Sequence, residues 1–154
     1  MTKAISLSYL AAALLTATAF LDQAHGAATA DEAKAFVERA VVHVKEVGEE
    51  QAFKDFMSKD GGFLQGDLYV FCYNADVTLV AIGSNPAMLG SNLRYLKDPD
   101  GKEASFELVR MGMEHGSGWV DYKWPNPVIK KIQTKSAYVI KVNDKVCGTG
   151  YYKD

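Results

Sequence analysis

Residues 118–127 read Gly-Trp-Val-Asp-Tyr-Lys-Trp-Pro-Asn-Pro, and this stretch decides the fold. Polar and apolar residues alternate along it, so a strand here would place Val120, Tyr122 and Trp124 on one face. The Pro-Asn-Pro that follows is typical of a turn, because proline fixes φ and asparagine bonds to nearby backbone. The pattern predicts a half-buried strand that ends in a sharp turn.

Two more strands are predicted after this turn. The first covers residues 136–142 and places Tyr138 and Val142 on a common face, and the second covers 146–152. Asn143 and Asp144 lie between them and favour a turn. The last third of the chain is therefore predicted to be a meander of about three strands.

Helical patterns come earlier in the chain. Thr29 and Glu32 have the spacing of a capping box, and apolar residues then recur at helical intervals. Gly48 interrupts this stripe, which resumes and ends at residues 60–62, so we expect a long or kinked helix. A second helix fits residues 103–114. Together with a hairpin predicted over 68–82, the order of elements indicates an α+β fold.

Composition excludes several classes of protein. The chain has 154 residues, of which 48% are hydrophobic and 23% charged, which is ordinary for one globular domain. Its net charge of -2 provides no basic surface for a phosphate backbone, so we expect no nucleic-acid partner. No metal-binding or cofactor motif is present, and we expect neither a metal nor a cofactor.

The N-terminus has the features of an export signal. Lys3 precedes an apolar run over residues 4–21, and small residues follow it. We interpret residues 1–26 as a secretory signal peptide and 27–154 as a single domain, periplasmic or secreted after cleavage. The alternative is an uncleaved membrane anchor, since the run approaches the length that spans a bilayer. In an oxidising compartment Cys72 and Cys147 would either form a disulfide or remain as buried thiols.

The motifs of the mature chain resemble the single Cache domain family of extracytoplasmic, PAS-like sensor modules. The resemblance rests on residues 118–127, on Lys135-Ser136-Ala137-Tyr138-Val139, and on several shorter stretches in the same order. Those stretches are residues 66–71, 85–93, 96–102 and 148–151. It implies a long N-terminal helix and a sheet of about five antiparallel strands that forms a small-ligand pocket. It also implies that the first and last strands are neighbours, which would bring Cys72 and Cys147 together.

The sequence departs from the family in two places. Relatives commonly carry a histidine after the second strand, where Ile82 stands here, so one ligand contact is expected to be absent. Relatives usually lie between two membrane helices, whereas this sequence stops at Asp154. We therefore expect the domain to report to a separate membrane-bound partner, a kinase or a chemoreceptor. Relatives often pair through the N-terminal helix, so the resemblance also makes a homodimer through this helix one of the alternatives.

A ligand pocket needs apolar walls and a few polar groups that orient the ligand. Tyr122 and Trp124 meet this requirement, and each could instead be a core aromatic. Tyr138 is the next candidate. Lys135 is also a candidate, although its spacing from Tyr138 puts the two on opposite faces unless the strand begins later or bulges. Tyr69 is a weaker one.

The loop before the second helix supplies the remaining candidates. If the ligand is a carboxylate, as several in the family are, Arg94 could bind it with both nitrogens and Tyr95 could cover it. A solvated arginine is the plainer interpretation of Arg94. Lys130 and Lys131 follow the Pro-Asn-Pro turn and indicate either an electropositive entrance or a protected sheet edge.

Three functions compete. We expect a noncatalytic module that binds a small organic molecule, such as a short carboxylate, and signals to a membrane partner. A structural or dimerisation domain with a closed pocket is the alternative. A hydrolase is the least favoured, because no nucleophile accompanied by a base is visible in the sequence.

Overall fold

The computed structural model describes residues 27–153. Three α-helices lie within this range, namely α1 (Ala30–Val47), α2 (Glu49–Met57) and α3 (Ala104–His115), with a short 3-10 helix η1 (Pro86–Met88). The capping box predicted at Thr29 and Glu32 is present at the start of α1. The predicted signal peptide lies outside the described residues.

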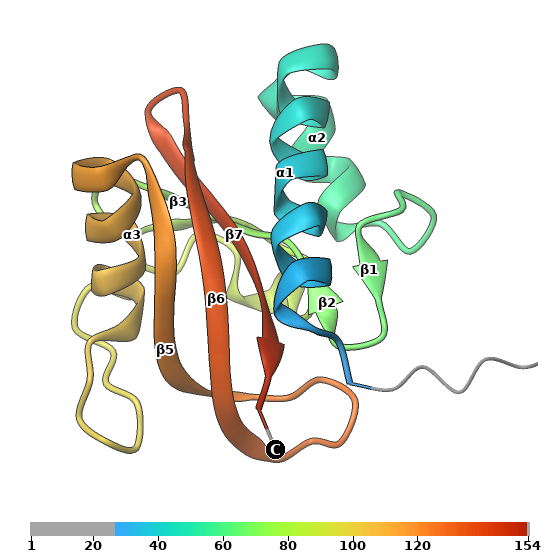
Figure 1. Cartoon of the computed structure of the whole chain (residues 1–154). Helices are drawn as coiled ribbons and strands as arrows, with labels where there is room; N and C mark the ends of the chain where they lie inside the picture. Colours follow the sequence, from blue (N-terminus) through green and yellow to red (C-terminus); the bar gives the residue numbers. More distant parts are fainter. Residues whose placement is uncertain (1–26, 154) are drawn as a thin grey trace, which may run out of the picture.

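Five strands form one antiparallel sheet in the order β4-β3-β7-β6-β5 (Figure 1). They are β3 (Phe71–Asn74), β4 (Leu79–Ile82), β5 (Ser117–Pro125), β6 (Ile132–Val142) and β7 (Lys145–Tyr152). The short strands β1 (Leu64–Gln65) and β2 (Leu68–Tyr69) pair separately. The predicted α+β architecture with a five-stranded antiparallel sheet is confirmed.

The long helix predicted near the N-terminus is divided in two at Gly48. This glycine has φ 83°, a left-handed conformation that ends α1. Its backbone N–H donates to the carbonyl of Val44, and α2 starts at the next residue. The kink predicted from the sequence is therefore a break between two helices.

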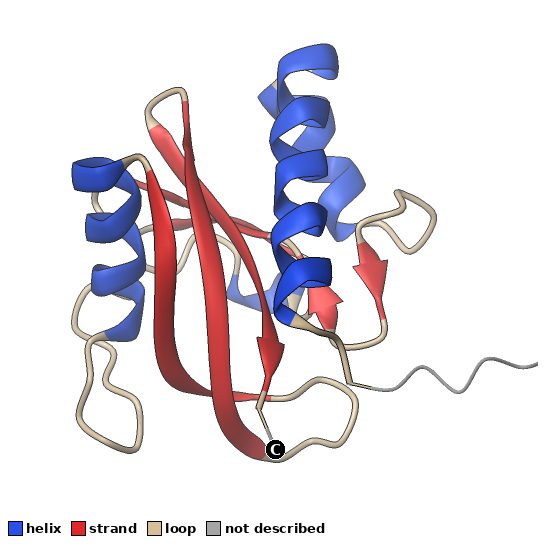
Figure 2. Ribbon diagram, viewed as in Figure 1, coloured by secondary structure: helices blue, strands red, loops and turns tan. Residues whose placement is uncertain are grey.

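The helices cover the two faces of the sheet (Figure 2). α1 and α2 lie on one face, over a core that contains Cys72 and Cys147. α3 lies on the other face and approaches it closely, since a Cβ at Gly112 would stand 2.6 Å from methyl groups of Val146. The sheet thus separates two hydrophobic cores, which we call the α1 core and the α3 core.

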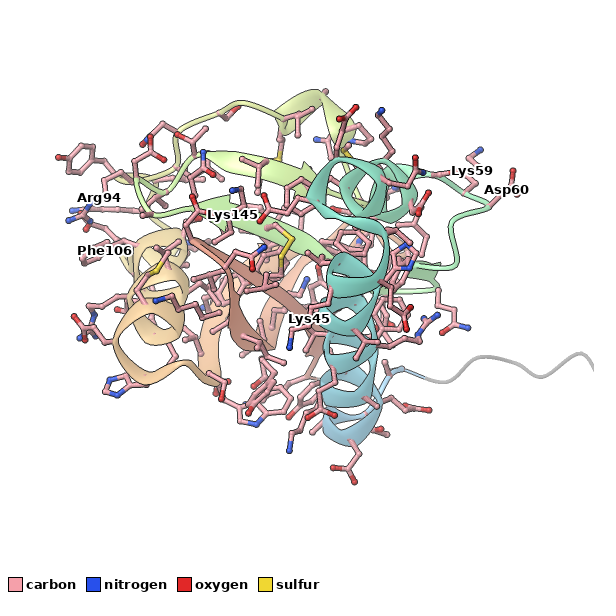
Figure 3. The ribbon with its side chains drawn as sticks, turned by 90° about the horizontal axis from the view of Figure 1, so that it is seen from above. Lys45, Lys59, Asp60, Arg94, Phe106 and Lys145 are labelled. Atoms are coloured by element: carbon pink, nitrogen blue, oxygen red, sulfur yellow. A yellow bond between two sulfur atoms is a disulfide. The ribbon has the colours of Figure 1, made fainter. Side chains whose placement is uncertain are left out.

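The two cysteines face each other on neighbouring strands. Cys72 of β3 is the register partner of Cys147 of β7, and their sulfur atoms form a disulfide inside the α1 core. Both residues are fully buried. The disulfide joins β3 covalently to the central strand β7 and is visible as a yellow bond in Figure 3.

Within residues 27–153, no helix combines the length and the apolar character that crossing a bilayer requires.

Candidate ligand-binding site

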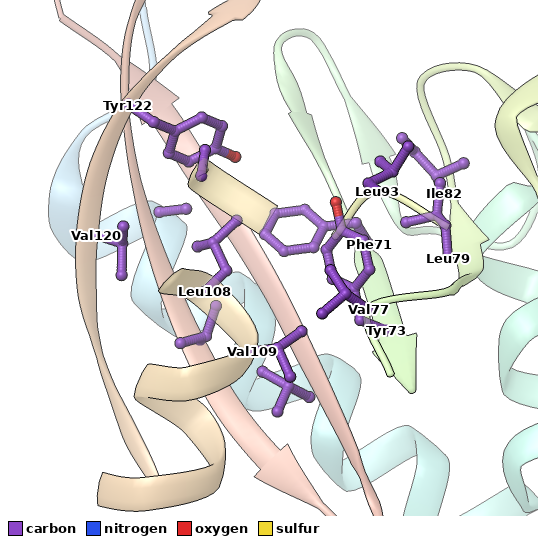
Figure 4. Close-up of a cluster of buried hydrophobic side chains, with 14 of the residues drawn as sticks. Phe71, Tyr73, Val77, Leu79, Ile82, Leu93, Leu108, Val109, Val120 and Tyr122 are labelled. Atoms are coloured by element: carbon purple, nitrogen blue, oxygen red, sulfur yellow. The ribbon is translucent and has the colours of Figure 1, made fainter. Parts of the chain in front are cut away.

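Tyr122 and Trp124 point from β5 into the α3 core, where the sequence pattern placed them. Their ring centroids are 6.0 Å apart at an interplanar angle of 67°. Tyr122 is buried, as Figure 4 shows, and Trp124 is partly buried. The two rings border a small void of about 10 Å³. The residues around the void are Tyr69, Phe71, Tyr73, Ile82, Tyr122 and Trp124.

Lys135 of β6 lies beside these rings. It is the register partner of both Tyr122 and Tyr152, and its side chain is fully buried. The Nζ atom stands 3.8 Å from the ring centroid of Tyr69, 5.0 Å from that of Tyr152 and 5.7 Å from that of Phe71. Among the residues that the structure describes, this Nζ finds no hydrogen-bond partner. Three aromatic rings surround the amine, and the carboxylate of Asp67 also acts on it electrostatically.

Burial changes the acid–base properties of this cluster. Desolvation lowers the pKa of Lys135, because the charged ammonium loses its hydration. Burial raises the pKa of Tyr69, but the charge of Lys135 acts against it and the net pKa is lowered. Burial also raises the pKa of Tyr122, and that of Tyr73 to about 12. Burial thus opposes a charge on Lys135, Tyr73 and Tyr122, whereas the neighbouring amine favours ionisation of Tyr69.

The phenol hydroxyls have defined roles. Tyr152 donates to the carbonyl of Pro125 at 2.8 Å. Its only proton is then used, so in the 3.4 Å contact between the two hydroxyls Tyr69 donates to Tyr152. Tyr73 bonds with Ser105 of α3 at 3.1 Å. These bonds fix the rings at the position where Lys135 projects.

Tyr138 does not belong to this group, and its grouping with Tyr122 is wrong. β6 begins at Ile132, so Lys135 lies inside a regular strand and Tyr138 falls on the opposite face. There its ring packs on Trp119 with centroids 5.0 Å apart, and the ammonium of Lys34 lies 5.5 Å from it.

Arg94 and Tyr95 also lie away from the void. The guanidinium of Arg94 stacks 3.3 Å from the ring centroid of Phe106 on α3, and its Nη1 lies 3.4 Å from a carboxylate oxygen of Glu103. Figure 3 shows Arg94 and Phe106 side by side at one edge of the molecule. Tyr95 is 79% exposed. The structure does not bring these two residues to Lys135.

Phe71 and Tyr73 line the void and Tyr152 packs on Lys135, but the sequence analysis did not name these three as candidates and gave Tyr69 little weight. Tyr69 lies on β2 and Phe71 and Tyr73 lie on β3, two short strands whose alternating residues carry no special signal for a ligand site. The signal for Tyr152 was weak as well, since it lies near the end of the chain. Only the strand order, with β7 between β3 and β6, brings these rings around one lysine.

A larger hollow of about 1090 Å³ opens at the start of α1. Its walls come from the first residues of α1, from β1 and β2, and from the loop between β5 and β6. Tyr152 lines this groove and also packs against Lys135, so it stands between the groove and the buried amine. Within residues 27–153, no group of three or more His, Cys, Asp or Glu residues is placed to hold a metal ion.

Known proteins resemble this chain in sequence and in fold. The methyl-accepting chemotaxis protein McpP of Pseudomonas putida is 27% identical over 90 residues, which are 57% of this chain. The chain spans 16% of the length of that receptor. The solved structure of a methyl-accepting chemotaxis protein from Vibrio parahaemolyticus superposes with a TM-score of 0.72 at 24% identity, covering 80% of this chain and 88% of the other.

Two further solved structures are similar. One is described as the structural basis for carboxylic acid recognition by a Cache chemosensory domain. It superposes with a TM-score of 0.68 at 23% identity, and the match covers 80% of this chain and 92% of that chain. The other is a periplasmic sensor domain of a chemotaxis protein, with a TM-score of 0.60 and 27% identity over 80% and 90% of the two chains.

The sequence model of the family described as "Single Cache domain 2" matches residues 11–154, which is almost the whole chain. The match confirms the resemblance that the sequence motifs indicated. This chain belongs to the Single Cache domain 2 family.

Proposed function

We propose that this domain is a noncatalytic sensor that binds a small organic ligand, such as a short carboxylate, against Lys135. The observation that carries the proposal is the fully buried Nζ of Lys135, which has aromatic faces around it and no hydrogen-bond partner among the described residues. Natural proteins seldom bury a lysine without a partner. An anionic ligand would supply that partner.

Charge and geometry favour a carboxylate as the ligand group. A carboxylate offers two acceptor oxygens to an ammonium, and such charge-assisted hydrogen bonds gain strength where water is excluded. The rings of Tyr122 and Trp124 would then face the apolar part of the ligand. One cation with an aromatic wall suits a ligand with one charged end and one short apolar end. The relative described for carboxylic acid recognition adds support.

Binding would require the site to open. The void holds about 10 Å³, and a single water already needs roughly 10–15 Å³. Trp124 is only partly buried, so its ring is the one that can move most easily, whereas an outward turn of Tyr152 would first have to break its bond to the carbonyl of Pro125. The ligand would therefore select or induce an opened form of the pocket.

We also propose that the domain acts outside the cytoplasm and passes its state to a membrane-bound partner. The similar proteins are chemotaxis proteins, one of them described as a periplasmic sensor domain. An enclosed disulfide suits an oxidising compartment. A kinase or a chemoreceptor would be the partner.

A ligand screen tests the proposal. Thermal unfolding of the full chain is followed with short monocarboxylates, dicarboxylates, amines and amino acids, and selective binding must raise the midpoint. We expect a response to carboxylates that Lys135→Met abolishes. Lys59→Met, on an exposed loop, should keep it. A midpoint unchanged by any carboxylate, or an unchanged response in Lys135→Met, would refute the proposed site.

The small volume of the void favours a second candidate, a structural domain with a closed pocket that pairs through α1. Val42 of α1 is 51% exposed and offers an apolar contact to a second copy. A dimer that forms without ligand and ignores every compound in the screen would favour this function. Sedimentation of the full chain with and without carboxylate separates the two.

A further inference from the structure

The loop between β5 and β6 presents three exposed aliphatic side chains. Val128 is 59% exposed, Ile129 48% and Ile132 57%. They lie within five consecutive positions at one extremity of the long β5–β6 hairpin, at the lower end of the sheet in Figure 1. We call residues 126–132 the hairpin tip. Large aliphatic residues concentrated on one projecting loop usually mark an interaction surface.

The hairpin tip is held in a defined shape. The side chain of Asn126 is buried, and its Oδ1 accepts from the backbone N–H of Val128 at 2.8 Å and of Ile129 at 3.4 Å. Its Nδ2 donates to Gln133 at 2.8 Å. Its backbone bonds to Lys130 and Lys131. The aliphatic side chains therefore project from a hydrogen-bonded frame, and docking would require little ordering of the backbone.

Two lysines lie between the aliphatic residues. Lys130 and Lys131 are exposed, and neither forms an ion pair with any residue in the described part of the chain. Lys130 also has φ 58°, a left-handed conformation that is strained for a lysine. Two unpaired positive charges thus accompany the apolar side chains, and the tip carries no acidic residue.

Both ends of the described chain lie near the hairpin tip. Ala27, Ala28 and Tyr152 line the same groove as Val128 and Ile129. In the sequence, the apolar run over 4–21 ends shortly before Ala27. Any membrane attachment of this chain through that run would begin on the side of the molecule where the tip projects.

We propose that the hairpin tip docks onto an anionic lipid bilayer, with the aliphatic side chains in the interface and Lys130 and Lys131 at the headgroups. Aliphatic residues beside lysines suit this surface, because apolar burial and attraction to anionic headgroups act together. The tip projects and is small, which suits shallow insertion better than the broad burial of a stable protein interface. The proposal is independent of the ligand at Lys135.

Methyl NMR of the full chain tests this proposal. The chain is mixed with bicelles of phosphatidylcholine and phosphatidylglycerol that contain a spin-labelled lipid. We expect the methyl signals of Val128, Ile129 and Ile132 to broaden. Val42 and Leu89, exposed to a similar degree on other elements, should stay sharp and provide an internal control. Attachment through residues 4–21 would also bring the tip close to the spin label, so variants of the tip are needed to separate docking by the tip from mere closeness to the bilayer.

Matched variants refine the test. Ile129→Asp should weaken bicelle binding by the tip roughly tenfold, since one aliphatic side chain no longer leaves water. Leu89→Asp should leave the broadening unchanged. The double variant Lys130→Glu and Lys131→Glu should strongly reduce the broadening of the tip methyl signals with anionic bicelles, and should not change it with pure phosphatidylcholine bicelles.

Three results would overturn the proposal. Tip methyls as sharp as those of Val42 and Leu89 would exclude docking by this loop. Equal broadening with pure phosphatidylcholine bicelles would exclude the anionic preference. Broadening that depends on protein concentration and needs no lipid would identify a second copy of the chain as the occupant.

Discussion

The two faces of one sheet differ in how their buried groups are satisfied. The α1 core is closed by the Cys72–Cys147 disulfide and by packed phenylalanines, such as Phe56 and Phe63 with centroids 4.7 Å apart. The α3 side contains tyrosine hydroxyls and the amine of Lys135, which has no hydrogen-bond partner among the described residues. A covalent bond and apolar packing support the first face, whereas the second keeps a buried amine for which the described residues supply no hydrogen-bond acceptor.

This difference separates stability from binding. Apolar packing and a crosslink stabilise the fold whether or not a ligand is present. A buried unpaired charge destabilises the fold until a counter-ion arrives. Binding of a ligand would therefore stabilise the α3 side, and the α1 core supplies enough stability for the domain to fold before a ligand binds.

Removing the disulfide should have the largest effect. Cys72→Ala with Cys147→Ala opens a crosslink between residues 75 positions apart, and chain entropy alone predicts a loss of about 4 kcal/mol. Urea unfolding, with the wild-type protein as reference, measures the change. If the α1 core and the α3 side of the sheet act independently, carboxylates should still bind and stabilise this double variant at temperatures where it is folded. A loss below about 1 kcal/mol would contradict the role given to the α1 core.

Lys135→Met should act in the opposite direction. Replacing a buried ion by an apolar side chain of similar volume is often stabilising, so we expect the ligand-free protein to gain about 2 kcal/mol. Lys59→Met, at an exposed position, should change the free energy of unfolding by less than about 0.5 kcal/mol. Destabilisation by Lys135→Met would mean that its contacts with the rings of Tyr69 and Tyr152 outweigh the cost of desolvation.

The strands could be predicted from the sequence because their pattern is local. Alternation over residues 119–124 placed Tyr122 and Trp124 on one face, and β5 confirms that strand and its orientation. The position of the interruption at Gly48 was also predicted, since a glycine inside a helical stripe weakens the helix, although the sequence indicated a long or kinked helix and not two separate ones. Both predictions needed only nearest neighbours in the chain.

The composition of the site could not be predicted in the same way. Which face Lys135 occupies depends on where β6 begins, and a start at residue 136 left that open. Its position beside Tyr69 and Tyr152 depends on the strand order, which no single strand encodes. Arg94 lies on a long irregular loop, where packing on Phe106 decides its direction. Long-range pairing thus limits site prediction more than it limits the fold.

The pH dependence of stability should reveal the buried amine. A lysine with a lowered pKa in the folded state binds its proton less tightly there than in the unfolded chain. The free energy of unfolding should therefore increase with pH in one window, from the lowered pKa of Lys135 in the folded state up to the ordinary value of 10.5. Lowering the pH through this window should remove the same stability. One proton allows a slope of at most about 1.4 kcal/mol per pH unit.

Urea unfolding at a series of pH values below 10 measures this slope. The limit matters because Tyr73, with its pKa raised to about 12, reverses the trend at higher pH. Lys135→Met should flatten the curve, since it also removes the charge that lowers the pKa of Tyr69. An identical slope in Lys135→Met would assign the pH dependence to other groups.

Arg94→Gln should have the smallest effect. Its side chain is 32% exposed, pairs with Glu103 at 3.4 Å and stacks on Phe106, and such partly solvated contacts contribute less than about 1 kcal/mol. Because the structure places Arg94 away from the void, carboxylate affinity measured by calorimetry should stay within a factor of about two, well under 1 kcal/mol. A tenfold loss of affinity would mean that the loop moves to the ligand on binding, and the recognition of the carboxylate would then be shared between Lys135 and the loop.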